Sequence, residues 1–185
     1  MIDHLSIPQV RVAVFIDGLN TMFRLRESNW EESFDVAYLA QRLAKNRILA
    51  GVFYFRAVPS MPHLIPSQYW KERRHLDRIE AQLWKLYARK VRLGYMAPRG
   101  MGWQEKQTDV WLAAEMITQA HENTYEIAIL VTADTDLVPA AYHVRLLEKG
   151  VELAVFPKAH PPVTELIRAA NSTTTVRRSF IRPYG

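Results

Sequence analysis

Short apolar runs alternate along the chain with longer amphipathic stretches. Five near-continuous apolar runs predict strands, at residues 10–16, 48–56, 90–96, 126–131 and 150–156. Such runs are typical of strands that are buried on both faces of a parallel sheet. Helical patterns lie between them, near residues 35–46, 68–89, 109–121 and 137–149. The alternation predicts an α/β fold with a central, mainly parallel sheet between layers of helices.

Three local signals refine this pattern. Gly150 follows the last helical stretch and predicts its end. Thr108 precedes Asp109 and predicts the N-cap of the third helix. The Pro, Ser and Met cluster at residues 58–67 predicts a loop.

Composition is consistent with one folded domain. The chain has 185 residues, of which 49% are hydrophobic and 23% charged, enough to bury a core without crosslinks. We expect a core over about residues 10–170 and a basic C-terminal tail over about 171–185. The absence of cysteine excludes disulfide frameworks and thiolate zinc sites. No signal peptide or membrane span is predicted, so we expect a cytoplasmic protein.

Positive charge is concentrated in two segments. Residues 68–106 contain ten Lys and Arg against four Asp and Glu, and residues 158–185 contain five against one. The net charge is +5, so the rest of the chain is acidic on balance. Basic surface beside an acidic site suits a protein that processes a polyanion, although a solvated face without a partner is the plain alternative.

Four aspartates lie at the predicted ends of elements. Asp17 ends the first strand in VAVFIDGLN, and Asp134 and Asp136 follow the fourth strand in AILVTADTDLVP. Asp109 lies where a helix begins, in EKQTDVWLAAEM. Ligands collect at the carboxyl ends of strands in parallel sheets, so we expect these carboxylates to converge.

Converging carboxylates repel one another unless a cation is present. Oxygen ligands of this kind suit Mg²⁺ or Mn²⁺, and such an ion can activate water for attack on phosphorus. Each acid also has a structural interpretation. Asp109 could be a first-turn acid favoured by the helix dipole, and Asp136 could cap the following helix. Asp17 has no evident capping role in the sequence.

Three motifs, FIDGLN, KQTDVWLAAEM and VTADTDLVPAAYHVRLLEKGVELAVF, occur in this order. Together they resemble the NYN domain, the LabA-like branch of the PIN-like nucleases, over about residues 10–170. The resemblance implies a PIN-like three-layer α/β/α sandwich and a metal-dependent ribonuclease. The catalytic and metal-binding residues that it implies are Asp17, Asp109, Asp134 and Asp136. Asn20 and Thr132 match supporting positions of the family.

The chain departs from the family pattern at two positions. Ala133 replaces a glycine, which restricts positive φ in the third motif, and Asn171 stands where relatives commonly have an acid. Glu115 matches a further acidic position. It follows Asp109 by six residues, however, which places it roughly 120° around the helix, so we assign it only a supporting role.

A basic helix face is predicted for substrate binding. On a helix over residues 68–90, five cations fall within an arc of roughly 60°: Lys71, Arg74, Arg78, Lys85 and Arg89. Leu76, Ile79, Leu83 and Leu86 occupy a separate arc that should face the sheet. Trp103 could stack on an unpaired base and Lys106 could contact a phosphate, while loop packing and a solvated face are the alternatives.

Other chemistries lack their motifs. The sequence has no GxGxxG or GxxxxGK[ST] pattern, no nucleophile elbow, and no metal-ligand spacing among its histidines. We therefore expect a divalent-metal-dependent ribonuclease acting on single-stranded RNA. A non-catalytic RNA-binding or regulatory NYN module is the alternative, and a small-molecule phosphohydrolase is third. The sequence predicts no membrane partner and leaves the oligomeric state open.

Overall fold

A single sheet organises the protein. The computed structural model describes residues 9–30, 34–59, 66–84, 89–99, 102–157 and 164–183. Within them, seven strands pair in the order β4-β3-β2-β1-β5-β6-β7. The strands are β1 (Arg11–Asp17), β2 (Ile48–Pro59), β3 (Arg89–Arg99), β4 (Gly102–Lys106), β5 (Ile127–Val131), β6 (Gly150–Val155) and β7 (Ser172–Thr175). Only the β3–β4 pair is antiparallel, which confirms the prediction of a mainly parallel sheet.

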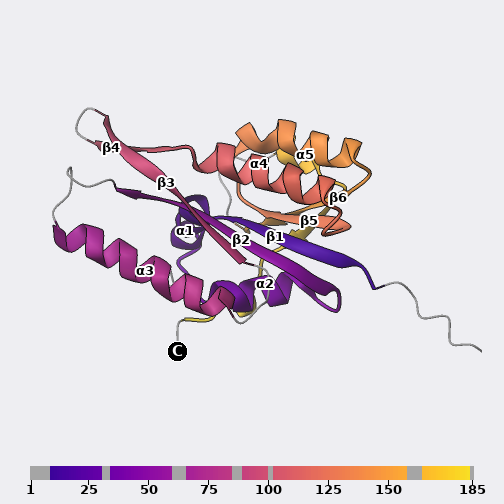
Figure 1. Ribbon diagram of the computed structural model, residues 1–185. Coiled ribbons are helices and arrows are strands. Elements are labelled where there is room, and N and C mark those ends of the chain that lie inside the picture. The colour runs from indigo at the N-terminus through magenta and orange to yellow at the C-terminus, as the bar shows by residue number, and fades with distance from the viewer. Residues whose placement is uncertain are drawn as a thin grey trace, which may run out of the picture.

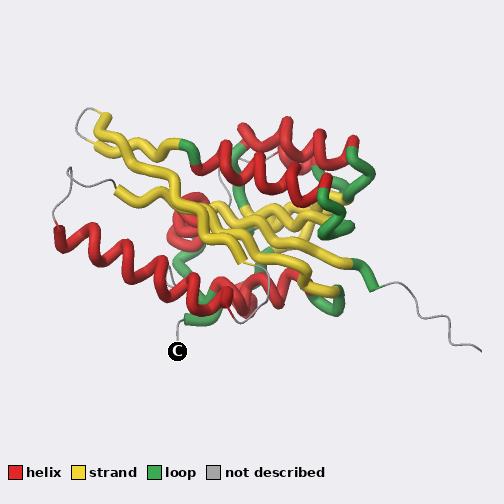
Figure 2. The backbone as a smooth tube through the Cα atoms, viewed as in Figure 1, coloured by secondary structure: helices red, strands yellow, loops and turns green. Residues whose placement is uncertain are grey.

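Helices cover both faces of this sheet (Figure 1). The helices are α1 (Gly18–Glu27), α2 (Val36–Ala44), α3 (Pro66–Trp84), α4 (Thr108–His121), α5 (Val138–Leu146) and α6 (Thr164–Ala169). Alternate residues of β1 separate two hydrophobic clusters. Val14 packs in one cluster with residues of α1, α2 and α3, and Phe15 packs in the other with residues of α4, α5 and α6. The tube in Figure 2 shows the resulting helix, sheet and helix layers, so the predicted three-layer sandwich is confirmed.

The C-terminal end of the predicted helix over residues 68–90 is corrected by the structure. The described part of α3 runs from Pro66 to Trp84, and Arg89 is the first residue of β3, where it pairs with Val52 of β2. The prediction that Arg89 lies on the basic helix face is therefore wrong. Pairing with β2 overrides the helical periodicity of the sequence, as tertiary context commonly does. Lys85 and Leu86 lie outside the described residues.

The C-terminal segment is part of the fold. Residues expected to form a tail contribute β7 and the 3₁₀ turn η2 (Arg178–Phe180). Val176, Phe180 and Ile181 are buried in the cluster beneath α2, and the backbone N–H of Asp35 donates to the carbonyl of Arg182 at 2.9 Å. Apolar side chains spaced between basic residues anchor this segment, and the sequence pattern alone did not distinguish them from a solvated tail.

Two predicted helix ends are also corrected. Helix α5 ends at Leu146, and Gly150 is instead the first residue of β6. The left-handed backbone in this turn belongs to Glu148, with a φ of 61°. Thr108 is the first helical residue of α4, and the N-cap is Gln107, with a φ of 71° and no side-chain capping bond. The sequence did not predict Gln107 as the N-cap, because a left-handed glutamine is an unusual N-cap and Thr108 beside it is a common one.

A buried glutamate joins β6 to the α2–β2 turn and to β7. Arg47 Nη1 donates to Glu152 Oε2 at 2.7 Å, and the Thr174 hydroxyl donates to the other carboxylate oxygen. Burial raises the pKa of Glu152. Hydrogen bonds from Arg47 and Thr174 and the charges of Arg47 and Lys45 lower it by more, so this pKa lies below its ordinary value.

The low pKa predicts an acid-dependent loss of stability. Glu152→Gln is expected to lower the free energy of unfolding by about 3 kcal/mol at pH 7, because Arg47 loses its charged partner. A lowered folded-state pKa stabilises the protein above the ordinary glutamate pKa of 4.5 and less so as the pH falls below it. Denaturant unfolding of the wild type and of Glu152→Gln should therefore show a difference in free energy of unfolding that becomes smaller from pH 7 towards pH 3. A difference that stays constant with pH would contradict the lowered pKa of Glu152.

Candidate functional site

Asp17 is a buried acid at the carboxyl end of the central strand. Its exposed fraction is 4%, and it is the N-cap of α1, where its Oδ1 accepts from the Asn20 N–H at 2.9 Å. The expectation that Asp17 has no capping role is therefore wrong. The sequence concealed the cap because α1 begins directly after the strand, with Gly18 as its first residue. Capping uses one carboxylate oxygen and does not account for the burial of the other.

The second carboxylate oxygen of Asp17 faces the end of β5. Strands β1 and β5 are parallel neighbours, with Ile16 opposite Val131, so the residues that follow them meet. Thr132, which is 4% exposed, donates its hydroxyl to Asp17 Oδ2 at 3.0 Å. The same hydroxyl accepts from the Asp134 N–H at 3.1 Å. One side chain thereby fixes both the Asp17 carboxylate and the loop that carries Asp134.

Asn20 forms a second bridge between these loops. Its Oδ1 accepts from the Ala133 N–H at 2.9 Å, while its backbone N–H donates to the capping carboxylate of Asp17. Ala133 is not among the described non-glycine residues with positive φ, so alanine is compatible with this loop. The supporting positions predicted at Asn20 and Thr132 thus lie beside Asp17 in the structure.

Asp134 and Asp136 occupy different positions in the loop after β5. Asp134 is half-buried and caps the 3₁₀ turn η1 (Thr135–Leu137), where its Oδ1 accepts from the Asp136 N–H at 2.9 Å. Asp136 is exposed and does not cap α5, whose N-cap is Leu137. The prediction that Asp136 caps the following helix is therefore wrong. The aspartate of this loop that acts as a cap is Asp134, and it caps η1.

Asp109 lies in the first turn of α4 and is half-buried. This position agrees with its interpretation as a first-turn acid, which the helix dipole favours. Glu115, six residues later on the same helix, is 6% exposed and accepts from Gln119 Nε2 at 3.1 Å. Beside Asp109, Val110 and Trp111 are 72% and 41% exposed, an apolar surface that the sequence analysis did not single out.

The donor types at this site fit a divalent cation. The Asp17 carboxylate accepts hydrogen bonds from the Asn20 N–H and the Thr132 hydroxyl, which orient its two oxygens. Carboxylate oxygens are the ligands that Mg²⁺ and Mn²⁺ prefer. In the described part of the chain, no three His, Asp or Glu side chains are placed closely enough to hold a metal together. Convergence of all four aspartates therefore stays a prediction.

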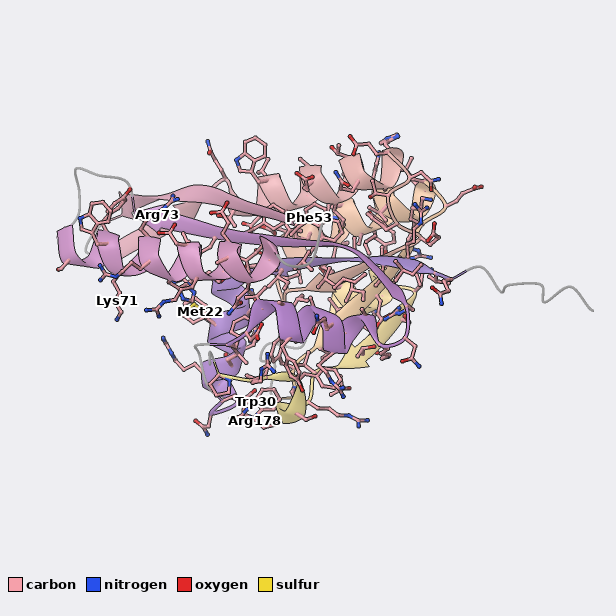
Figure 3. All side chains as sticks on the ribbon, turned by 60° about the horizontal axis from the view of Figure 1, so that its bottom comes forward. Met22, Trp30, Phe53, Lys71, Arg73 and Arg178 are labelled. Carbon is pink, nitrogen blue, oxygen red and sulfur yellow. The ribbon has the colours of Figure 1, made fainter. Side chains whose placement is uncertain are left out.

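A buried cation lies at the same end of the sheet. Arg56 is 7% exposed and follows Phe55, the β2 residue that pairs with Asp17. Its Nη1 contacts the Met22 sulfur of α1, and Figure 3 labels Met22 on this helix. The sequence analysis missed Arg56, although one arginine inside the apolar run VFYFRAVP is a usable signal for a functional or paired charge.

The predicted nucleic-acid-binding residues separate into three groups. Lys71, Arg74 and Arg78 are exposed on α3, opposite the buried Leu76 and Ile79, as the periodicity predicts. Lys71 projects from α3 away from the sheet in Figure 3. Trp103 and Lys106 belong to β4, where the backbone alone is described, and Lys85 lies outside the described residues.

Comparison with protein families gives an assignment for the whole domain. The model of the NYN domain family matches residues 11–177. The chain belongs to the NYN domain family. The expected membership is confirmed at this level, which places the chain in the PIN-like nuclease superfamily. The match does not distinguish the LabA-like branch, which stays a prediction.

Other comparisons bear on the fold of this NYN domain. A solved structure from Vibrio parahaemolyticus RIMD 2210633, VPA0982, described as a protein of unknown function, superposes with a TM-score of 0.66 at 19% sequence identity. The superposition covers 94% of this chain and 97% of that one, so the likeness shows a shared fold. No curated protein matches the sequence. None of the described helices has the length and apolar character needed to cross a membrane.

Proposed function

We propose that this NYN domain is a divalent-metal-dependent ribonuclease that hydrolyses phosphodiester bonds in single-stranded RNA. The observation that carries the proposal is the buried Asp17 carboxylate, oriented by Asn20 and Thr132 at the carboxyl end of β1. A buried acid held by donors from helix α1 and from the loop after β5 is more than a helix cap requires. Family membership supports nuclease chemistry at this position.

The aspartates of this site would bind the metal ion, and Thr132 would position them. Asp17 and Asp134, whose positions are linked through Thr132, would bind the cation directly, because Mg²⁺ is commonly held by one or two carboxylates and keeps several waters. Asp109 and Asp136 would act on the waters of that ion. A bound Mg²⁺ or Mn²⁺ would supply an activated water and would stabilise charge on the phosphate. Thr132 holds the carboxylate of Asp17 and the backbone of Asp134 in a fixed relation through its single hydroxyl. Such preorganisation lowers the cost of arranging charges during the reaction.

Removal of divalent cations is the direct test of this proposal. Purified protein incubated with labelled single-stranded RNA should cleave it in Mg²⁺ or Mn²⁺ and should lose activity in EDTA. Activity should return when the cation is added in excess. Gel analysis of labelled products measures both. Cleavage that continues in EDTA would contradict metal dependence, and RNA binding without cleavage in either cation would support the non-catalytic NYN module instead.

The exposed cations of α3 are proposed to hold the RNA backbone. Lys71, Arg74 and Arg78 lie on one arc of the helix, and within the described residues none of them forms an ion pair with an acid. Arg73, by contrast, donates to Asp77 at 3.0 Å on the same helix. Unneutralised cations on one arc suit a chain of phosphates, which positions RNA without reading its sequence.

Replacing Arg74 and Arg78 by glutamine should weaken RNA binding and flatten its dependence on salt. Each phosphate contact contributes a slope of about −0.7 for single strands, so the double variant should lose about 1.4 from the slope of log affinity against log salt. Fluorescence anisotropy with labelled RNA measures both quantities. The cleavage defect should be in KM more than in kcat, because these contacts hold substrate and transition state alike.

The matched control removes the same charge from the opposite face of the sheet. Lys149 follows α5 and Arg168 lies in α6, and their double glutamine variant should leave the salt slope close to that of the wild type. An equal loss in both double variants would indicate a general effect of net charge and would contradict a specific role for α3.

A further inference from the structure

A polar groove runs along the β7 edge of the sheet, on the face covered by α2. Its volume is about 550 Å³, and its lining includes Arg42, Lys45, Arg177 and the threonines at 173–175. The sheet order places β7 three strands away from β1, so this groove is separate from the Asp17 site. It is also separate from α3, which covers β2 and β3. Figure 3 shows Lys71 of α3 and Arg178 of η2 well apart on this face.

The groove is positively charged. Three of the described lining residues are cations and none is an acid. The nearest buried acid, Glu152, is already bound by Arg47 and Thr174, so it adds little negative charge at the surface. Lys45 Nζ donates to the Thr174 hydroxyl at 3.2 Å, which directs the ammonium group into the groove.

The other lining groups are hydrogen-bonding side chains. Threonine hydroxyls from β7 and the amides of Gln41 and Asn46 stand between the cations. Phe180, the one large apolar side chain among the described lining residues, is 8% exposed, and the Arg42 guanidinium lies 5.4 Å from its ring centre. The described lining therefore has no exposed apolar centre of the kind that a protein partner would need. Hydroxyls, amides and cations together are the groups that contact phosphate and sugar.

We propose that this β7 groove binds the sugar-phosphate backbone of single-stranded RNA, as an anchoring site distinct from the Asp17 site and from α3. The identity of the polyanion rests on the proposed function, whereas the charge of the groove does not. A strand held at both the groove and the active face gains affinity from the second contact, since the two attachments are linked through one molecule. The groove contributes binding and no catalytic group.

The test compares RNA binding by two double variants. Lys45→Gln with Arg177→Gln removes two groove cations, both of which are exposed. The variant is made in the full chain, also in the Asp17→Asn background, so that binding is measured without cleavage. Anisotropy with labelled oligouridylate should show several-fold weaker binding and a salt slope that is smaller by about 1.4. The Lys149→Gln, Arg168→Gln variant supplies the control and should retain the wild-type slope.

Several results would overturn the proposal. One is an RNA affinity and a salt slope that are unchanged in the groove variant. Another is binding of labelled polyglutamate to the wild type as tightly as oligouridylate. A change of molecular mass in light scattering, without a change in RNA affinity, would assign the groove to contact between copies. Failure of the ribonuclease proposal is distinguishable, because it would abolish cleavage in every cation while leaving the groove-dependent binding of RNA in place.

Discussion

Replacing Asp17 by asparagine is expected to lower the rate of RNA cleavage on the order of 100-fold or more, because the site loses a charge that electrostatic catalysis requires. The substitution keeps the shape of the side chain. Asparagine is also among the best N-cap residues, so the bond from the Asn20 N–H is retained. The Thr132 hydroxyl must reorient to face an amide nitrogen, at a cost of about 1 kcal/mol. Cleavage of labelled RNA and thermal unfolding measure the two effects separately.

A second aspartate in the chain provides the control for this variant. Asp35 caps α2 with φ −76° and ψ 103°, against φ −76° and ψ 104° for Asp17, and each accepts one backbone N–H at 2.9 Å. Asp35 also pairs with Arg182 at 2.6 Å. Asp35→Asn therefore removes a capping charge and one ion pair without touching the site.

The two variants should separate catalysis from stability. Asp35→Asn should lose some stability and retain cleavage, whereas Asp17→Asn should retain most of its stability and lose cleavage. Equal cleavage by Asp17→Asn and the wild type would remove the central observation on which the ribonuclease proposal depends. Alanine at this position would lose both the cap and the bond to Thr132, so we expect asparagine and not alanine to retain most of the stability.

Gly18→Ala is expected to destabilise the protein by about 3 kcal/mol, since overpacking of a rigid interior costs about this much. A β-carbon at this position would lie 2.4 Å from Cζ and from the hydroxyl of Tyr54, and 2.9 Å from the Phe55 carbonyl oxygen. Tyr54 is fully buried in β2, so its ring has no room to retreat. Denaturant unfolding would measure the loss, which is the largest stability effect that we expect from one methyl group.

Gly150→Ala is the matched control. The added β-carbon would come to 3.2 Å from Ile127 Cγ1, a flexible side-chain atom, so the cost should stay within about 1 kcal/mol. If both alanine variants lost the same stability, general glycine effects and not the contact with Tyr54 would be responsible.

The sheet was predictable because its strands carry an unambiguous pattern. The run from Val12 to Ile16 is apolar at every position and fully buried in the structure, as expected of a central parallel strand. Helix α1 and strand β7 were not predicted. Helix α1 begins directly after β1, so no loop signal in the sequence marks its start. Strand β7 is four polar residues, SerThrThrThr, whose strand character comes from pairing with β6.

Individual residues of the site were predictable, and their connections were not. Strand ends in a parallel sheet point to one edge, which is enough to bring Asp17 and Thr132 together. The roles of Thr132 as donor to one aspartate and acceptor for the next depend on loop geometry that no spacing rule gives. Arg56 was overlooked for a different reason, because a single charge within an apolar strand looks like a break in the pattern.

The bond between Thr132 and Asp17 joins residues 115 positions apart in the chain. Contacts of this sequence separation form late, because the intervening chain must be ordered before they close. A polypeptide emerging from the ribosome therefore exposes Asp17 long before Thr132 has been synthesised. Asp17 acquires the orienting hydroxyl only after β5 has taken its place beside β1.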